Sequence, residues 1–489
     1  MGVRGNGHPT PEREGQGIRP SRAPAPGRGY FRLAPLSLFM STRPPGPRGE
    51  PLFGNGRRYS RDPFSFMTDV ADAYGDVVRL DLGPRETYML TNPRDVERVL
   101  VSDWAAFEKP NLDDAIDDLL GDGLLMSERD RWQQQRDLAN PAFHARRIAG
   151  LDDAIVGHTE ETMAGWSDGD RVDVQLELAR LTVRVIVTAM FGTDITDERV
   201  RTVQEHLEPL GQRFEPNAVR AIIPSWAPTR ENREFHGAVS TLEGVIDDLV
   251  ARRRGTEETA PDPAGDAVDS PMPMDLLSIL LRAHERGDQT EGDLRDELMT
   301  MLLAGHDTTA LALTYTFYLL SRHPDAKARF QREVDALDGA PTSEDVRGLE
   351  FTDRVLSEAM RLYPPVYTLF RESKVDTRIA GYRIPEGSLI MLPQWVIHRS
   401  DRWYDDPLEF DPDRWAPERA RERPRFAYYP FGAGPRHCIG KQFSLLEAKL
   451  ILATVGRAFD FEYEGPELDL RGSLTMHPDH PMPLRLSSR

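Results

Sequence analysis

Apolar side chains recur at helical spacing through most of the chain and at strand spacing in a few short stretches. Helical spacing marks the stretches 62–74, 93–100, 151–166, 174–190, 197–214, 233–254, 291–321 and 443–459. The alternation typical of strands marks 77–83, 87–90, 366–370, 378–380 and 388–392. The pattern therefore predicts a mainly α-helical fold with a small β region.

The longest predicted helix, 291–321, contains the polar segment Ala304-Gly305-His306-Asp307-Thr308-Thr309 inside an apolar run. Gly305 alone costs about 1 kcal/mol relative to alanine in a helix interior. We expect a locally loosened backbone here, where a buried Asp307 beside the Thr308 hydroxyl could deliver protons. The alternative is that the threonine hydroxyls bond back to the preceding turn at a harmless kink. His306 is expected to be a hydrogen-bonded neighbour and not a metal ligand.

The only cysteine, Cys438, lies in the segment Phe431-Gly432-Ala433-Gly434-Pro435-Arg436-His437-Cys438-Ile439-Gly440, just before the last long helix. The unpaired N–H groups and partial positive charge of a helix start favour a thiolate. The glycines allow tight turns and the close approach of a flat group. A buried cysteine that acts as a small apolar residue is the alternative. A single cysteine cannot form an internal disulfide, which indicates a reducing, cytoplasmic setting.

Two weaker motifs involve arginine. Ser127 is expected to cap a helix, with Asp130 three positions on, and Trp132 and Arg136 share one face of that helix. This arginine either is solvated beside an aromatic anchor or binds the carboxylate of an acidic cofactor.

The second motif is Glu358 and Arg361, three apart on a helix that ends before Pro364-Pro365. An exposed pair of this kind contributes little to stability.

Composition narrows the function classes. The net charge is −19, and only five of the 61 basic residues are lysines. An acidic surface argues against nucleic-acid binding and suits solubility at high salt, which indicates a halophilic host. The preference for arginine over lysine has a second explanation in the codon usage of a GC-rich genome. No apolar run approaches the roughly 20 residues of a membrane span.

Three stretches are expected to lie outside the packed fold. Residues 1–39 are rich in Gly, Pro and Arg, which predicts disorder, or a misassigned extension upstream of a start at Met40. Residues 40–489 are then one catalytic domain. The apolar loop 216–228 is a candidate lid over a pocket, or ordinary packing, and 257–273 reads as a surface linker.

The cysteine segment closely resembles the haem-ligand loop of the cytochrome P450 family. Four further segments match that family in order and spacing: Ala304 to Thr309, Glu358-Ala359-Met360-Arg361, Phe410-Asp411-Pro412-Asp413-Arg414-Trp415, and Trp132 with Arg136. The resemblance covers about residues 50–486. Trp415 stands where the family often has phenylalanine, which preserves an aromatic side chain.

The resemblance implies the P450 fold, with haem b between the long central helix and the helix after the cysteine loop. Cys438 would be the axial thiolate on iron. Asp307 and Thr308 would relay protons to bound dioxygen. Glu358, Arg361 and Arg414 would form a structural salt-bridge network, buried and not exposed. The cofactor-binding residues would be Trp132, Arg136, Arg371, Phe431, Gly434, Arg436 and Gly440.

The same resemblance implies a monooxygenase that hydroxylates a lipophilic small molecule with dioxygen. It does not distinguish between a fatty acid, a terpenoid and a carotenoid as the substrate. Electrons would come from a separate ferredoxin with its reductase, because no flavin or nicotinamide region follows the haem helix. Substrate contacts are expected from 110–125, 212–229, Ala304, Thr368, Leu369, Phe370, Leu474 and Thr475. The alternatives are a peroxide-using or rearranging relative, a non-catalytic haem-thiolate sensor, and a cysteine that binds no haem.

Overall fold

The computed structural model describes residues 43–111, 114–217, 226–258 and 275–489. The stretch Thr42–Arg489 forms one compact unit. The predictions for residues 1–39 and for most of 257–273 lie outside the described residues. The same holds for the centre of the candidate lid, residues 218–225.

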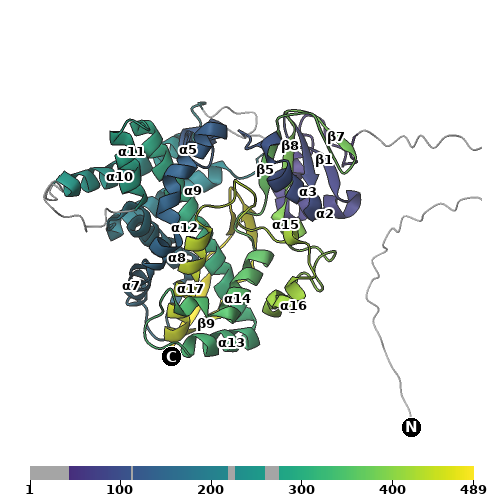
Figure 1. Ribbon diagram of the computed structural model, residues 1–489. Coiled ribbons are helices and arrows are strands. Elements are labelled where there is room, and N and C mark those ends of the chain that lie inside the picture. Colours follow the sequence, from purple (N-terminus) through teal and green to yellow (C-terminus); the bar gives the residue numbers. More distant parts are fainter. Residues whose placement is uncertain (1–42, 112–113, 218–225, 259–274) are drawn as a thin grey trace, which may run out of the picture. The chain divides into compact units, whose positions relative to one another are not determined.

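Helices make up most of the fold and surround one long central helix, α12 (Glu291–Arg322) (Figure 1). Helix α12 begins with a capping box formed by Thr290 and Asp293, so its first N–H groups are satisfied locally. It packs against α8 (Val174–Ile186), α14 (Glu350–Leu362), α10 (Arg230–Glu258) and α17 (Lys441–Ala458). The other principal helices are α2 (Pro63–Tyr74), α3 (Pro93–Glu97), α4 (Asp114–Leu120), α5 (Arg129–Ala139), α7 (Asp152–Met163), α9 (Asp197–Arg213), α11 (Leu276–Glu285) and α13 (Pro324–Asp335).

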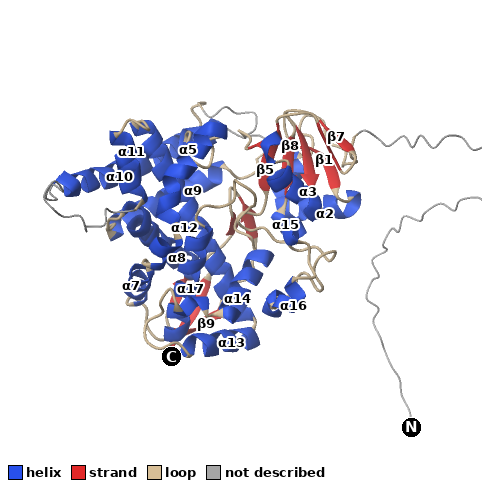
Figure 2. Cartoon of the chain, viewed as in Figure 1, coloured by secondary structure: helices blue, strands red, loops and turns tan. Residues whose placement is uncertain are grey.

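The largest sheet has the strand order β1-β2-β8-β5-β3 and lies beside the helices (Figure 2). Its strands are β1 (Val77–Asp81), β2 (Glu86–Leu90), β3 (Phe107–Glu108), β5 (Leu369–Ser373) and β8 (Leu389–Leu392). Strands β2 and β8 pair in parallel, with Thr87 opposite Leu389, and the remaining pairs are antiparallel. Three smaller sheets join β4 (Arg171–Asp173), β12 (Pro483–Ser488) and β9 (Phe459–Tyr463); β10 (Leu470–Gly472) and β11 (Met476–Pro478); and β6 (Thr377–Ile379) and β7 (Tyr382–Ile384).

The large sheet is buried on both faces, because alternate side chains of one strand enter different apolar clusters. On β1, Val78 and Leu80 join one cluster while Val77 joins the other. On β2, Met89 joins the first and Tyr88 and Leu90 join the second. Period-two alternation produces this division. The main core, among the helices, is separate and larger.

The predicted mainly α fold with a small β region is confirmed. Helix α11 was not predicted, although its side chains are almost all buried. The predicted strand 366–370 lies instead at Leu369–Ser373. Among the described residues, no helix combines the length and apolarity needed to cross a membrane.

Two local predictions are wrong. Helix α12 runs without interruption through 304–309, and the hydroxyls of Thr308 and Thr309 donate to the carbonyls of Ala304 and Gly305 at 2.9 and 3.4 Å, the bonds to the preceding turn that were the stated alternative. Ser127 does not cap α5. Glu128 occupies the N-cap position, and the Ser127 hydroxyl donates to the side chain of Gln135.

Candidate active site

The cysteine loop is closed by its own backbone and fixed by one indispensable glycine. The Cys438 N–H donates to Phe431 O at 2.9 Å, and the His437 N–H donates to Gly434 O at 3.2 Å. Gly434 has a φ of +68°, and a Cβ there would lie 1.8 Å from Leu100 O. No other residue type fits that position.

Gly440, the N-cap residue of α17, is less constrained. A Cβ there would make ordinary contacts of 3.8 Å with Phe143 and 3.9 Å with the Cys438 sulfur. Of these two glycines, only Gly434 leaves no room for a Cβ atom.

The Cys438 side chain is accessible to solvent although protein atoms surround it on most sides. Burial raises the pKa of the thiol. The backbone N–H groups of Gly440 and Lys441, and the charges of Arg136 and Lys109, act in the opposite direction. A coordinated metal cation would complete the deprotonation, because metal-bound thiols ionise outright.

Three cations gather beside this loop. The Arg371 side chain is 7% exposed, and its guanidinium donates to Phe370 O at 2.7 Å. Burial and the charge of Arg436 lower the pKa of Arg371 to about 10. Burial, Arg436 and Arg371 lower the pKa of Lys109 well below its usual range. Arg436 donates to Ser127 O at 2.6 Å and lies 3.2 Å from the Glu128 carboxylate.

Glu128 is the one carboxylate that acts on all three cations, Lys109, Arg371 and Arg436. Glu108 also acts on Arg436, so three cations face two carboxylates in a partly buried place, and this excess of positive charge is unfavourable without an anionic ligand. A flat group that carries two carboxylates and a thiolate-binding metal fits this set of donors. Haem has both features, and the residues present fit it.

Arg136 and Trp132 reach the same region from α5. Arg136 donates to His437 O at 2.9 Å, so it contacts the cysteine loop directly. Trp132 is buried, and the guanidinium that stacks on its ring is that of Arg436, 4.9 Å from the ring centre. Trp132 therefore contacts the cysteine loop through Arg436, while Arg136 contacts it directly.

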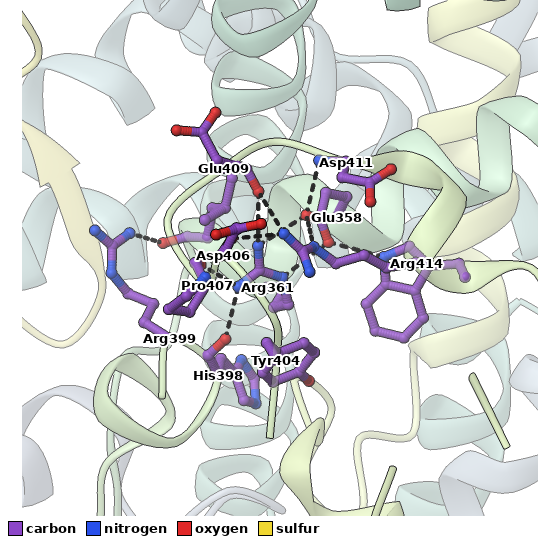
Figure 3. Close-up of polar contacts among 12 residues, drawn as sticks. Glu358, Arg361, His398, Arg399, Tyr404, Asp406, Pro407, Glu409, Asp411 and Arg414 are labelled. Carbon is purple, nitrogen blue, oxygen red and sulfur yellow. Dashed lines mark hydrogen bonds and ion pairs between the residues drawn. The ribbon is translucent and has the colours of Figure 1, made fainter. Parts of the chain in front are cut away.

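Glu358, Arg361 and Arg414 meet in one buried network (Figure 3). The Glu358 carboxylate accepts two hydrogen bonds from Arg361, at 2.8 and 2.7 Å, and one from Arg414 at 3.1 Å. The first two residues come from α14, and Arg414 comes from the segment 398–415. Burial makes this pair very different from an exposed one, because loss of one partner leaves an uncompensated charge.

The network ties the segment 398–415 to α14. Arg361 donates to the carbonyls of His398, Pro407 and Glu409 at 2.8, 2.6 and 3.1 Å (Figure 3). Trp415 donates its indole N–H to Glu358 at 3.0 Å. The tryptophan thus does more than preserve an aromatic side chain, because a phenylalanine has no N–H to give.

Asp307 and Thr308 are neighbours in sequence, but in the described structure no hydrogen bond joins their side chains. The Asp307 carboxylate accepts a hydrogen bond from Thr475 at 2.7 Å and lies 3.4 Å from His477 Nε2. The Thr308 hydroxyl donates to Ala304 O. His306 is buried, and its Nδ1 lies 2.8 Å from Leu302 O. It is a hydrogen-bonded neighbour, as expected.

The residues expected to contact the substrate differ in their exposure and in their neighbours. Ala304 is exposed on α12, and Leu474 is 47% exposed at the β10–β11 turn. Thr368 is buried and its hydroxyl has no partner among the described residues. Phe370 packs into an apolar cluster beside the sheet.

Leu369 and Thr475 have other neighbours. A Cβ at Gly432 would lie 3.8 Å from Leu369, so this leucine lines the cysteine loop. Thr475 is bonded to Asp307.

Four functional candidates were missed from the sequence: Lys109, Glu128, Thr475 as a partner of Asp307, and His477. Lys109 carried a weak signal as one of only five lysines in the chain. The other three carried none, because their partners lie on distant segments.

The chain matches the family model described as "Cytochrome P450" over residues 44–483. It is 36% identical to cyclooctatin synthase of Streptomyces melanosporofaciens over 420 residues, which cover 84% of this chain and 88% of that protein. It is 32% identical to pentalenene oxygenase of Streptomyces avermitilis over 458 residues, or 92% of this chain and 97% of that protein. Cyclooctat-9-en-7-ol 5-monooxygenase of Streptomyces melanosporofaciens is 32% identical over 435 residues, or 86% and 92%.

The fold has a close match among solved structures. The crystal structure of the cytochrome P450DA heme domain superposes with a TM-score of 0.78 at 26% sequence identity. The match covers 91% of this chain and 98% of the other.

Proposed function

Because the chain belongs to the cytochrome P450 family and is an oxygenase of that family, we propose that it binds haem b and hydroxylates a lipophilic small molecule with dioxygen. Membership of the family implies a haem-thiolate cofactor. We propose in addition that the haem is of the b type. The observation that carries it is the Cys438 thiol beside the unbalanced cations Lys109, Arg371 and Arg436.

The residues that would hold the cofactor follow from their contacts. Cys438 would ligate the iron, and Arg136, Arg371, Arg436 and Lys109 would hold the two propionates. Trp132 supports Arg436 by stacking on its guanidinium, and Gly434 lets the loop approach Leu100. When bound, the haem supplies the activation of dioxygen, which the thiolate ligand promotes.

The remaining site residues act on protons and on architecture. We propose that Asp307 and Thr308 move protons into the pocket, with the Thr308 hydroxyl as the last group. At rest, Thr308 donates its proton to Ala304 O, so its oxygen lone pairs are free to accept another. Glu358, Arg361 and Arg414 would have a structural role, because they bind one another and backbone carbonyls.

The substrate class rests on the pocket residues and on the relatives. Ala304, Phe370 and Leu474 are apolar, and Thr368 offers a single buried hydroxyl. Two relatives are named for an unsaturated carbon skeleton, pentalenene and cyclooctat-9-en-7-ol. We therefore propose an unsaturated, mostly hydrocarbon substrate. A spectral-shift screen of the ferric protein against pentalenene, long-chain fatty acids and carotenoids distinguishes these classes.

A separate ferredoxin with its reductase is the proposed electron donor, and reconstitution with a ferredoxin or a flavodoxin pair tests it. The proposed location is the cytoplasm, supported by the single unpaired cysteine. Cell fractionation tests the location.

The central experiment replaces Cys438. Cys438→Ala should abolish the thiolate-type spectrum of the ferrous protein with carbon monoxide, and retention of that spectrum would contradict the ligand assignment. Thr308→Ala should raise hydrogen peroxide release per dioxygen consumed. Thr314→Ala is the matched control, because Thr314 lies on the same helix and makes the same bond to the preceding turn, at 2.8 Å from Ala310 O. Equal peroxide release from both variants would contradict the relay.

A further inference from the structure

We propose that His477, positioned by Thr475 on the β10–β11 hairpin, belongs to the proton relay and supplies protons to Asp307. This inference rests on the proposed monooxygenase function. It concerns how the acid of that relay regains its proton, and it assigns a proton-donating role to His477 and a positioning role to Thr475, both outside α12.

Two side chains, those of Thr475 and His477, converge on one carboxylate oxygen of Asp307. Thr475 donates its hydroxyl proton to Asp307 Oδ2 at 2.7 Å. His477 Nε2 lies 3.4 Å from the same oxygen and 2.8 Å from the Thr475 oxygen. Since Thr475 has one hydroxyl proton and gives it to Asp307, its oxygen must accept from His477. The Nε2 atom therefore carries a proton that faces both Thr475 and Asp307.

The hairpin that carries these two residues is fixed in place. Tyr315, on α12, donates to Met476 O at 2.6 Å, between Thr475 and His477. The Met476 N–H donates to Pro365 O at 2.8 Å, and the Ser473 hydroxyl donates to Gly211 O at 2.8 Å. The position of His477 is thus set by α12 and by two further segments.

The charges around the pair favour a proton on the histidine. Burial alone would raise the pKa of Asp307, but His477 and His306 lower it far below its usual range. Burial alone would lower the pKa of His477, but the Asp307 carboxylate raises it above its usual value. At neutral pH a histidine with a raised pKa is the ordinary group for exchanging protons with water.

The other charged groups near His477 largely offset one another. Arg471 lowers the pKa of His477 and Glu215 raises it. These two form an ion pair at 3.0 Å. Gln175 Nε2, on α8, lies 3.4 Å from His477 Nδ1 and is neutral. Asp307 is therefore the charge that sets the protonation of His477.

The arrangement gives a balanced proton step. The His477 side chain is 20% exposed, and that of Asp307 is 26% exposed. Because the pKa of Asp307 lies below that of His477, the transfer of one proton from His477 Nε2 to Asp307 Oδ2 is unfavourable at rest, and the neutral acid is a transient form that passes its proton on. The imidazole then regains one proton from water. The neutral carboxylic acid no longer attracts His477 and can turn toward Thr308, to which it makes no bond at rest. No electrons move in this step.

The test uses the haem-loaded protein and needs no organic substrate. In the diamagnetic ferrous–carbon monoxide form, the pKa of His477 is measured by nitrogen-15 NMR. It should lie above the ordinary value of about 6.5 and should fall in Asp307→Asn. A value at or below 6.5 that does not change in Asp307→Asn overturns the proposal.

The second readout is hydrogen peroxide released per dioxygen consumed, with a ferredoxin–reductase pair as electron source. His477→Gln keeps a donor toward Asp307 but has no titratable proton. It should raise peroxide release by up to about tenfold and remove its pH dependence between about 6 and 8. Thr475→Val should act in the same direction, and Thr475→Ser should restore the wild-type value.

The outcomes separate the two proposals. If Thr308→Ala raises peroxide release and His477→Gln behaves as the wild type at every pH, only the role of His477 is overturned. If neither variant differs from the wild type, both the role of His477 and the proposed relay through Asp307 and Thr308 are overturned. A His477→Gln effect that is the same at every pH indicates a purely structural role and also overturns the proposal.

Discussion

Trp415 donates its indole N–H to Oε2 of Glu358 at 3.0 Å, in a place where the carboxylate is 0% exposed. The other hydrogen bonds to this carboxylate come from Arg361, Arg414 and the Asp411 backbone. The tryptophan is therefore a neutral donor in a network that otherwise relies on two arginines and one backbone N–H. A fully satisfied buried carboxylate is stable only while each donor is present.

Replacement of Trp415 by phenylalanine should lower the free energy of unfolding by about 1.5–3 kcal/mol, the typical contribution of a hydrogen bond to a charged group. Urea unfolding measures it. Trp403→Phe is the control, because the indole N–H of Trp403 has no partner among the described residues. Equal losses in both variants would show that aromatic packing, and not the bond to Glu358, sets the cost.

Gly434→Ala should prevent stable haem incorporation. A positive φ costs a non-glycine residue about 1–2 kcal/mol, and the new Cβ would collide with Leu100 O. Gly440→Ala should incorporate haem nearly as the wild type does, because its Cβ meets only ordinary contacts. The ratio of Soret to protein absorbance after purification compares the two. A normal ratio in Gly434→Ala would contradict the geometry of the loop.

Arg371→Gln should weaken haem binding and leave the apoprotein at least as stable as the wild type. The variant removes one cation from a cluster of like charges, so repulsion from Arg436 and Lys109 is relieved. Loss of a charged contact of about 2 kcal/mol corresponds to about 30-fold in haem affinity. Haem transfer to apomyoglobin measures the affinity, and urea unfolding of the apoprotein measures stability.

The matched control for this variant is Arg399→Gln. Arg399 donates to Leu362 O at 2.7 Å and stacks on Trp395, 3.9 Å from the ring centre, away from the cysteine loop. It should cost stability without changing haem affinity. If Arg371→Gln lowered stability without changing haem affinity, and Arg399→Gln lowered haem affinity, Arg371 would not be a cofactor-binding residue.

Glu297, on α12, makes stability depend on pH. It is buried, and burial raises the pKa of this group to about 7. Because the folded-state pKa lies above the unfolded-state value, the contribution to stability is full below about pH 4.5. It is lost as the pH rises through about 7, by about 3 kcal/mol in total. Glu297→Gln should remove this loss.

The measurement is urea unfolding at several pH values between 4 and 8. Glu285→Gln, which changes an exposed carboxylate on α11, should leave the pH profile unaltered. If Glu297→Gln retains the full decline of stability with pH, the decline belongs to another group.

The parts of the site that sequence reasoning could predict are those encoded by short spacings. The cysteine loop and the Glu358–Arg361 pair are local, so their residue types indicate their chemistry. The partners of Asp307 are not local. Thr475 lies 168 residues further along the chain, and only the fold brings its hydroxyl to the carboxylate. The charge balance at Lys109 and Glu128 depends on contacts between α5, the sheet and the cysteine loop in the same way.

The local errors also have physical reasons. Ser127 has the composition of a helix cap, but its hydroxyl finds a buried partner in Gln135, and Glu128 takes the N-cap position. The polar segment of α12 has poor intrinsic helix propensity. The helix continues there because packing against α8 and α14 overrides that propensity.

The parallel pairing of Thr87 on β2 with Leu389 on β8 affects how this protein folds during its synthesis on the ribosome. The β1–β2 hairpin is synthesised early, yet the strand that covers its edge follows about 300 residues later. At about 5–20 residues per second, that edge waits roughly 15–60 s for its partner. An unpaired strand edge is a template for association with other chains. Expression yield should therefore respond to chaperone supply during translation more than to the stability of the finished fold.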